Sequence, residues 1–147
     1  MSRGEAHWVL IGLYRHTIDG KGRLVIPQRF RADLGARFVI TRGLDGCLTV
    51  YPLSEWGRLV EQIKAAPMSE GRTMQRYFFA HAEEAEQDAQ GRVMLPAELR
   101  QMVGIEREVV VVGVESVMEV WDPAAWEDYS PKATESDVLE ALRKSGM

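Results

Sequence analysis

Two short stretches of the chain carry the same pattern of charged and turn-forming residues. One reads Asp-Gly-Lys-Gly-Arg from Asp19 to Arg23, and the other reads Asp-Ala-Gln-Gly-Arg from Asp88 to Arg92. The aspartate predicts a tight turn, because its short carboxylate accepts backbone N–H groups within the turn. A lysine and an arginine on a narrow turn also suit contact with a polyanion, since arginine forms two hydrogen bonds with guanine in the DNA major groove. The pattern is therefore compatible with a purely structural turn and with a nucleic-acid contact.

The two stretches lie in surroundings of opposite charge. Residues 14–31 carry five basic side chains against one acidic side chain, a net charge of +4, whereas residues 83–100 carry two against five, a net charge of −3. The whole chain has a formal charge of −4, so its basic character is local. This contrast predicts that the first stretch meets a polyanion and that the second has another role.

The charge contrast divides the candidate site residues into two groups. The residues expected to contact DNA are Lys21 and Arg23 on the turn, and Arg15 and His16 before it. Arginine and lysine on the turn suit base edges, and the preceding pair suits phosphates. The residues expected to be structural are Asp19, which would fix the turn and orient Arg23, and the second pair, Asp88 and Arg92.

The similarity of the two stretches continues well beyond the turns. Asp88 follows Asp19 by 69 residues, and at the same offset a proline, a second arginine and a closing glycine also coincide. After a slip of one residue, Gly43, Val50 and Trp56 match Gly113, Val120 and Trp126. Each copy holds a few short strands and one small helix, which is too little to bury a core alone. We therefore expect an α+β fold in which two half-domains pack as a pseudo-twofold, β-barrel-like unit with short helices.

Alternating apolar and polar residues, turn-forming residues and prolines together predict the strands and helices of both copies. The expected strands are 8–18, 24–26, 38–41 and 48–51 in the first copy, and 82–87, 93–95, 108–112 and 117–121 in the second. The expected helices of the copies are 27–35 and 96–103, each beginning at a proline, and Asp122 is an expected N-cap. The first two strands should form a hairpin, a two-stranded ribbon tipped by Lys21 and Arg23 and narrow enough for the major groove.

The remaining segments complete the expected domain organisation. Residues 1–8 are an N-terminal extension, 9–56 and 81–126 are the two copies, 57–80 is a helical connection, and 127–147 is a C-terminal tail. Apolar spacing predicts helices at 54–66 and 72–80, and a weakly amphipathic, frayed segment at 138–142. Trp56 and Trp126, at matching positions, are expected to anchor the core or an interface.

Composition excludes several other classes of protein. No stretch approaches the roughly 20 apolar residues of a membrane span, and the N-terminus lacks the pattern of a signal peptide. The single cysteine, Cys47, cannot form an internal disulfide, which favours the cytoplasm. The histidines and the cysteine lack metal-ligand spacing, so neither a metal nor another cofactor is expected.

Two chemical alternatives are weaker than the turn motif. Gly20-Lys21-Gly22 lacks the full phosphate-binding pattern, because Arg23 stands where a hydroxyl would be required. The acidic residues from Glu83 to Glu86 could serve acid–base chemistry, but a solvated strand or a partner-facing surface explains them more simply. No small-molecule substrate is therefore expected, and an enzyme acting on a small ligand is the weakest hypothesis.

The turn motifs belong to a larger set of recognisable residues. That set comprises Gly12, the segment His16 to Arg23, Ile26-Pro27, Arg31, Tyr51-Pro52 with Trp56, Arg76 with Phe79 and Ala82, Asp88 with Gly91-Arg92, and the segment Glu119 to Asp122. With these residues the chain resembles the MraZ family of bacterial transcriptional regulators over residues 9–126. The second turn departs from the family pattern, because Ala89-Gln90 stands where a lysine would be.

The resemblance carries its own expectations about fold and function. It implies a swapped-hairpin fold like that of AbrB-type regulators, with both half-domains in one polypeptide and protomers assembled into rings. It also implies binding to short direct repeats in the promoter of the family's own division and cell-wall gene cluster. Asp19, Lys21 and Arg23 would form the DNA-reading element.

Residues and resemblance together predict a homo-oligomeric, sequence-specific DNA-binding regulator without catalytic activity, cofactor or membrane association. Its partners would be promoter DNA and further copies of itself, in the cytoplasm and on the nucleoid. The rival hypothesis is an oligomeric, non-enzymatic scaffold whose basic hairpin docks on an acidic protein partner, such as the acidic second copy of a neighbour.

Overall fold

The computed structural model describes residues 10–130 and 134–147. The N-terminal extension, the predicted start of the first strand at Trp8, and residues 131–133 of the tail lie outside the described residues. The strands are β1 (Leu10–Thr17), β2 (Arg23–Val25), β3 (Arg37–Arg42), β4 (Leu48–Pro52), β5 (Glu83–Glu86), β6 (Arg92–Met94), β7 (Glu108–Glu115) and β8 (Met118–Trp121). The helices are α2 (Gln28–Leu34), α3 (Leu53–Ala65), α4 (Met68–Phe79), α5 (Ala97–Met102), α6 (Pro123–Tyr129) and α7 (Glu135–Lys144).

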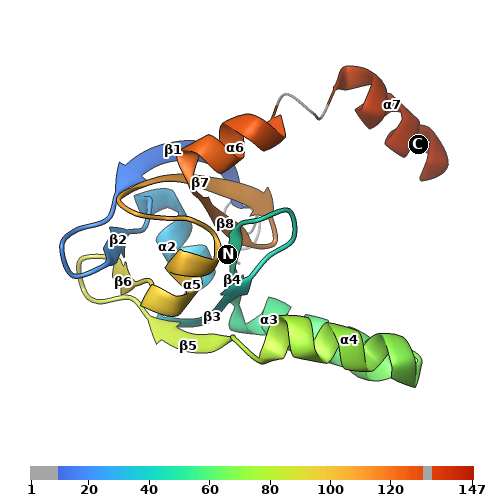
Figure 1. The fold of residues 1–147 in the computed structure, drawn as a ribbon, viewed down its shortest axis with the longest axis horizontal. Helices are drawn as coiled ribbons and strands as arrows, with labels where there is room; N and C mark the ends of the chain where they lie inside the picture. Colours follow the sequence, from blue (N-terminus) through green and yellow to red (C-terminus); the bar gives the residue numbers. More distant parts are fainter. Residues whose placement is uncertain (1–9, 131–133) are drawn as a thin grey trace, which may run out of the picture.

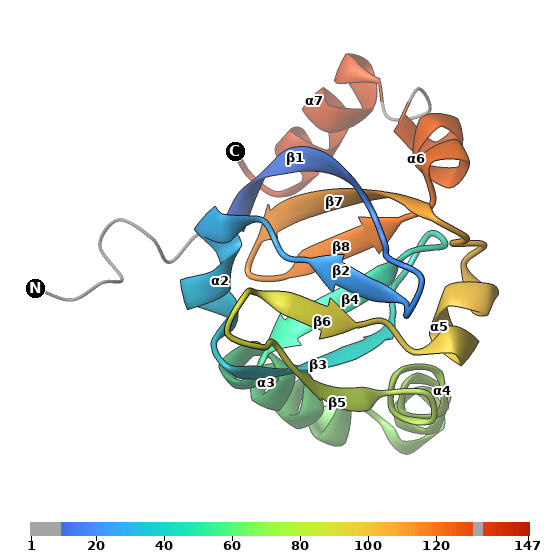
Figure 2. The same cartoon turned by 90° about the vertical axis from the view of Figure 1, so that its left-hand side faces the viewer.

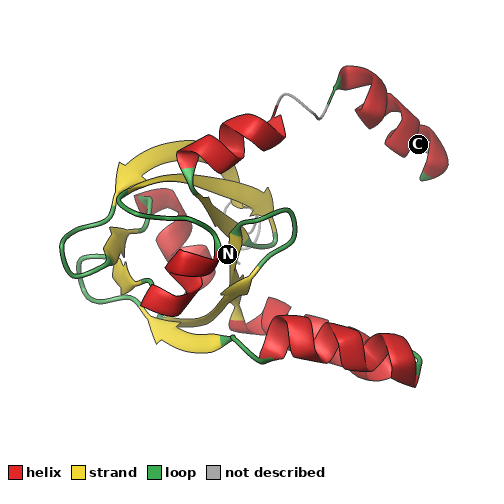
Figure 3. Cartoon of the chain, viewed as in Figure 1, coloured by secondary structure: helices red, strands yellow, loops and turns green. Residues whose placement is uncertain are grey.

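Strands of the two copies interleave in one curved antiparallel sheet with the order β1-β7-β8-β4-β3-β5 (Figures 1 and 3). β1 of the first copy pairs with β7 of the second, and β5 of the second pairs with β3 of the first. The remaining strands, β2 and β6, pair with each other as a separate ribbon with one strand from each copy. This exchange confirms the predicted fold of tandem, swapped half-domains.

The predicted hairpin between residues 8–18 and 24–26 is wrong. β1 and β2 do not pair with each other, because each pairs with a strand of the other copy. The residues from Asp19 to Arg23 do form a local turn, as their types indicated. A turn sets only the direction of the chain, and the burial of apolar surface across the copies selects the strand partners.

Repeat-equivalent residues stand opposite each other at two places. Leu24 faces Val93 in the ribbon, and Thr49 faces Glu119 where β4 pairs with β8. Equivalent residues of two copies face each other in an antiparallel pair only where a twofold axis passes between them. A pseudo-twofold axis therefore passes through the ribbon and through the centre of the sheet.

The ribbon lies between the two edge strands of the sheet, β1 and β5, and contacts both (Figure 2). These edge strands are not hydrogen-bonded to each other, so the barrel-like unit is not a closed barrel. Leu24 and Val93 point from the ribbon into the main core, where they join Phe30 of α2 and Leu99 of α5. The ribbon thus covers the open side of the curved sheet with its apolar face.

The outer face of the sheet has a smaller apolar cluster beneath α6. Trp121 and Val110 are buried there, and Trp126 packs edge-on against Trp121 with ring centroids 5.3 Å apart. Asp122 caps α6 by accepting a hydrogen bond from the backbone N of Ala125 at 3.1 Å, as the sequence predicted.

Two further helices, α3 and α4, form a hairpin that projects from the body (Figure 1). Trp56 anchors its base through ring contacts with Tyr51 and Phe79. α4 begins at Met68, four residues before the predicted start, because Pro67 directly precedes its first turn. α7 also exceeds its predicted length, since Thr134 and Asp137 form a capping box. No described helix is both long and apolar enough to cross a membrane.

Adjacent residues of β2 should differ sharply in their contribution to stability. Leu24 is fully buried, whereas Val25 is 40% exposed. We expect Leu24→Ala to lower the free energy of unfolding by about 2–5 kcal/mol, because it leaves a cavity in the core. Val25→Ala should lower it by less than about 1 kcal/mol. Chemical denaturation at one fixed protein concentration measures both values, and equal losses would contradict the orientation of the ribbon.

Candidate nucleic-acid interface

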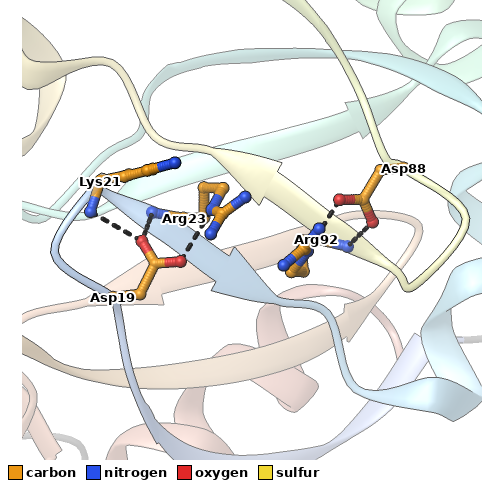
Figure 4. Close-up of polar contacts among 5 residues, drawn as sticks. All are labelled: Asp19, Lys21, Arg23, Asp88 and Arg92. Atoms are coloured by element: carbon orange, nitrogen blue, oxygen red, sulfur yellow. Dashed lines mark hydrogen bonds and ion pairs between the residues drawn. The ribbon is translucent and has the colours of Figure 1, made fainter.

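The first turn is built around the carboxylate of Asp19. Its Oδ1 accepts hydrogen bonds from the backbone N of Lys21 and of Arg23, both at 2.9 Å, and its Oδ2 accepts one from Arg23 Nε at 2.7 Å (Figure 4). The backbone N of Asp19 donates to the carbonyl of Arg23 at 2.9 Å and closes the turn. Asp19 therefore holds the backbone of the turn and the side chain of Arg23 at once.

The second turn repeats this arrangement. Asp88 Oδ1 accepts from the backbone N of Gln90 and of Arg92, both at 2.9 Å, and Oδ2 accepts from Arg92 Nε at 2.8 Å. The pKa of both aspartates is lowered, first of all by the backbone N–H of the arginine in each turn, and that of Asp19 falls to about 2. The two motifs are thus equivalent in local geometry.

The ribbon brings both motifs onto one surface. Side chains alternate along a strand, so the burial of Leu24 and Val93 directs their neighbours outward. The outward residues are Arg23 and Val25 of β2 and Arg92 and Met94 of β6, and together they form what we call the ribbon face. Figure 4 shows Arg23 and Arg92 side by side on the ribbon, between the two aspartates. The sequence did not indicate this convergence, because the predicted ribbon came from the first copy alone.

Lys21 and Gln90 occupy equivalent positions on the two turns. Both are exposed, and each donates its backbone N–H to the aspartate of its turn. The arginines themselves are similarly accessible, with 29% of the Arg23 side chain and 33% of the Arg92 side chain exposed. The ribbon face is therefore symmetric in its arginines and asymmetric in the residues beside them.

The side chains of the other two candidate residues, Arg15 and His16, point in opposite directions from β1. Arg15 and His16 are neighbours on β1 and so lie on opposite faces of the sheet. Arg15 reaches the outer face, where its Nη2 pairs with Glu127 Oε1 of α6 at 3.0 Å. His16 is half-buried and lies near Val25 and Pro27 around a shallow hollow. The structure thus keeps His16 beside β2 and separates Arg15 from the ribbon face.

Other chemical groups form no second candidate centre in the described part of the chain. Within residues 10–130 and 134–147, no three His, Cys, Asp or Glu side chains are grouped so that they could hold a metal ion. Burial raises the pKa of the Cys47 thiol to about 12, which keeps it protonated and a poor nucleophile at neutral pH. Glu83, Glu84 and Glu86 are exposed on the edge strand β5.

The lowered pKa of Asp19 predicts how the first turn responds to acid. An aspartate whose pKa falls from 3.8 to about 2 on folding stabilises the turn fully above about pH 4 and loses that contribution as the pH falls toward 2. We expect the carboxyl carbon of Asp19 to titrate near pH 2 in an NMR experiment. Arg23→Ala should keep the pKa below 3.8, because the backbone N–H at position 23 remains. A titration midpoint of 3.8 in the intact protein would contradict the turn.

Known proteins match the chain along nearly its whole length. The MraZ protein family, also described as antitoxin-like, matches residues 9–76 and again residues 78–144. The Transcriptional regulator MraZ of Desulfitobacterium hafniense strain Y51 is 50% identical over 130 residues, 87% of this chain and 91% of the relative. The proteins of that name from Moorella thermoacetica and Heliobacterium modesticaldum are 46% and 47% identical, and each alignment covers 91% of this chain and 94% or 96% of the relative. The chain therefore belongs to the MraZ family, as its doubled motif indicated.

Proposed function

We propose that this protein is a transcriptional regulator that binds DNA through the ribbon face and the two turns beside it. The observation that carries the proposal is the meeting of both Asp-x-x-x-Arg motifs on one exposed surface, with each arginine held by its aspartate. The relatives described above bear the name of a transcriptional regulator, which supports the same function. Cytoplasmic and nucleoid localisation follows from this proposal.

The geometry of the ribbon suits a DNA groove. Two antiparallel strands are narrow enough for the major groove, which is about 12 Å wide. Arg23 uses Nε to bind Asp19, so its two Nη nitrogens remain to donate to O6 and N7 of a guanine. The aspartate also orders the arginine before DNA arrives, which reduces the entropy lost on binding.

We propose that the first turn contributes more to DNA binding than the second. The arginines are equivalent in geometry, so the difference comes from their neighbours. Lys21 adds a cation next to Arg23, whereas Gln90 adds none next to Arg92. The acidic strand β5 precedes the second turn and repels phosphates from that side.

Matched alanine variants test this division. Arg23→Ala should weaken binding by about 1–3 kcal/mol per engaged site and reduce discrimination between sequences. Arg92→Ala should have a much smaller effect when the oligomeric state is the same. Fluorescence anisotropy with the promoter upstream of the protein's own gene and with a scrambled fragment measures both effects. Equal losses would refute the division, and equal, salt-insensitive affinities for the two fragments would favour the protein-docking scaffold.

We further propose that the protein acts as a ring on short direct repeats in the promoter of its own division and cell-wall gene cluster, as the family resemblance implies. Each protomer offers only a few cations to DNA from a chain of net charge −4. One ribbon should therefore bind weakly, since each neutralised phosphate contributes a salt slope of only about −0.9. Several ribbons on one assembly raise the effective concentration of the later contacts, and the avidity gain is about 10² to 10⁴.

The number of boxes in the DNA should therefore control affinity. We expect both the affinity and the magnitude of the salt slope to rise when DNA carries two or three boxes instead of one. Titrations at several salt concentrations measure both quantities. If a single box bound as tightly as three and with the same slope, the multivalent model would be wrong.

A further inference from the structure

Each turn of the candidate interface rests against an arginine from the other copy. Arg100 of α5 donates from Nε to the carbonyl of Leu95 at 2.9 Å, and this bond places its guanidinium against Gly22 in the first turn. A Cβ at Gly22 would lie 2.9 Å from Arg100 Nη2 and 3.2 Å from Cζ. Gly22 also has a φ of +81°, a conformation that glycine adopts without strain. Only glycine therefore allows the turn to approach the arginine this closely.

The reciprocal contact joins the first copy to the second turn. Arg31 of α2 donates from Nε to the carbonyl of Ile26 at 2.9 Å, and its guanidinium covers Gly91. Backbone bonds cross in the same way. Ile26 N donates to the Gly91 carbonyl at 2.8 Å, and Leu95 N donates to the Gly22 carbonyl at 2.9 Å. Each turn is thus bonded to a strand end, and covered by an arginine, of the opposite copy.

We propose that Arg100 is a positioning residue for the first turn, a role that rests on the proposed DNA-binding function. Gly22 lies between Lys21 and Arg23, so a contact that fixes Gly22 fixes the backbone from which both side chains extend. Leu95 links the parts, because its carbonyl holds Arg100 and its N–H holds Gly22. An ordered turn loses less entropy when it binds DNA.

The distribution of charge alone would give the larger role in DNA binding to Arg31. Arg31 belongs to the basic copy that the charge contrast assigns to DNA, whereas Arg100 belongs to the acidic copy. The contacts cross between the copies, so Arg100 serves the turn with Lys21 and Arg31 serves the turn with Gln90. Charge therefore predicts that Arg31 contributes more to DNA binding than Arg100, whereas the contacts predict the reverse.

Lysine substitutions separate positioning from a simple charge effect. Arg100→Lys keeps the positive charge but loses the Nε hydrogen bond to Leu95 and the planar contact with Gly22. We expect it to reduce affinity for the promoter fragment upstream of the protein's own gene by about tenfold. This is the usual cost of ordering one long side chain on binding, which Arg100 would otherwise have reduced by holding the turn. Affinity for a scrambled fragment should change little. Arg31→Lys, the matched control, should change promoter affinity less than threefold, within about 0.65 kcal/mol.

A double-mutant cycle and amide exchange complete the test on the full-length chain. If Arg100 acts through the first turn, the effects of Arg100→Lys and Arg23→Ala should be strongly non-additive, whereas those of Arg100→Lys and Arg92→Ala should add. Hydrogen exchange well below the melting temperatures should show faster exchange of the Lys21 and Arg23 amides in Arg100→Lys, and not in Arg31→Lys.

Three results would overturn the proposal. Full DNA affinity in Arg100→Lys would mean that Arg100 contributes only its charge or contributes nothing to binding. Equal losses of affinity in the two lysine variants would indicate a general structural role. Unchanged exchange of the Lys21 and Arg23 amides would show that Arg100 does not hold the turn. If Arg23→Ala had no effect on promoter binding, the proposed function would fail, and the exchange experiment would still decide whether Arg100 positions the turn.

Discussion

The exchange of strands between the two copies is the constraint on which the other features of this molecule depend. One copy alone has short strands and a single short helix against its core, and its apolar residues would remain in water. Exchange places Leu24 and Val93 opposite each other and lets both reach a common core. The same exchange puts the ribbon on the pseudo-twofold axis, and so a requirement of folding places the two turn motifs together on one surface.

The turns show how a symmetric framework accommodates an asymmetric surface. Asp19 and Asp88 accept a hydrogen bond from the backbone N of the residue two positions on, which any residue except proline can donate. The turn therefore forms equally well with Lys21 or with Gln90. Positions whose side chains are not required by the fold are those where the two copies have acquired different charges, whereas the aspartate, glycine and arginine that build the turn are the same in both.

Local features of the fold followed from the sequence because they depend on residues that are close in the chain. The turn at Asp19, the helix beginning after Pro27 and the cap at Asp122 are of this kind. The family and the doubled unit also followed, because the repeat is visible as identical residues at fixed spacing. The strand partners could not be predicted. The alternation of apolar and polar residues in 8–18 shows that one face is buried, but it does not identify the strand that pairs with it.

The candidate site was only partly predictable for the same reason. Arg15 pairs with Glu127, which is 112 residues away, and no local pattern links the two. The contacts of Arg31 and Arg100 with glycines of the opposite copy did leave a signal, because both arginines and both glycines are identical between copies whose neighbouring charges have diverged. That signal indicates a shared structural requirement without showing that the partners are crossed.

The ribbon face also carries exposed apolar side chains beside its arginines. Val25 and Met94 are 40% and 50% exposed, although the strands that carry them already contribute Leu24 and Val93 to the core. Each of them stands directly across the ribbon from an arginine, Val25 from Arg92 and Met94 from Arg23. In a DNA groove, arginines recognise guanine and an apolar side chain contacts the methyl group of thymine. Under the proposed function, the ribbon face would therefore offer both kinds of contact to DNA, with each arginine beside an apolar side chain.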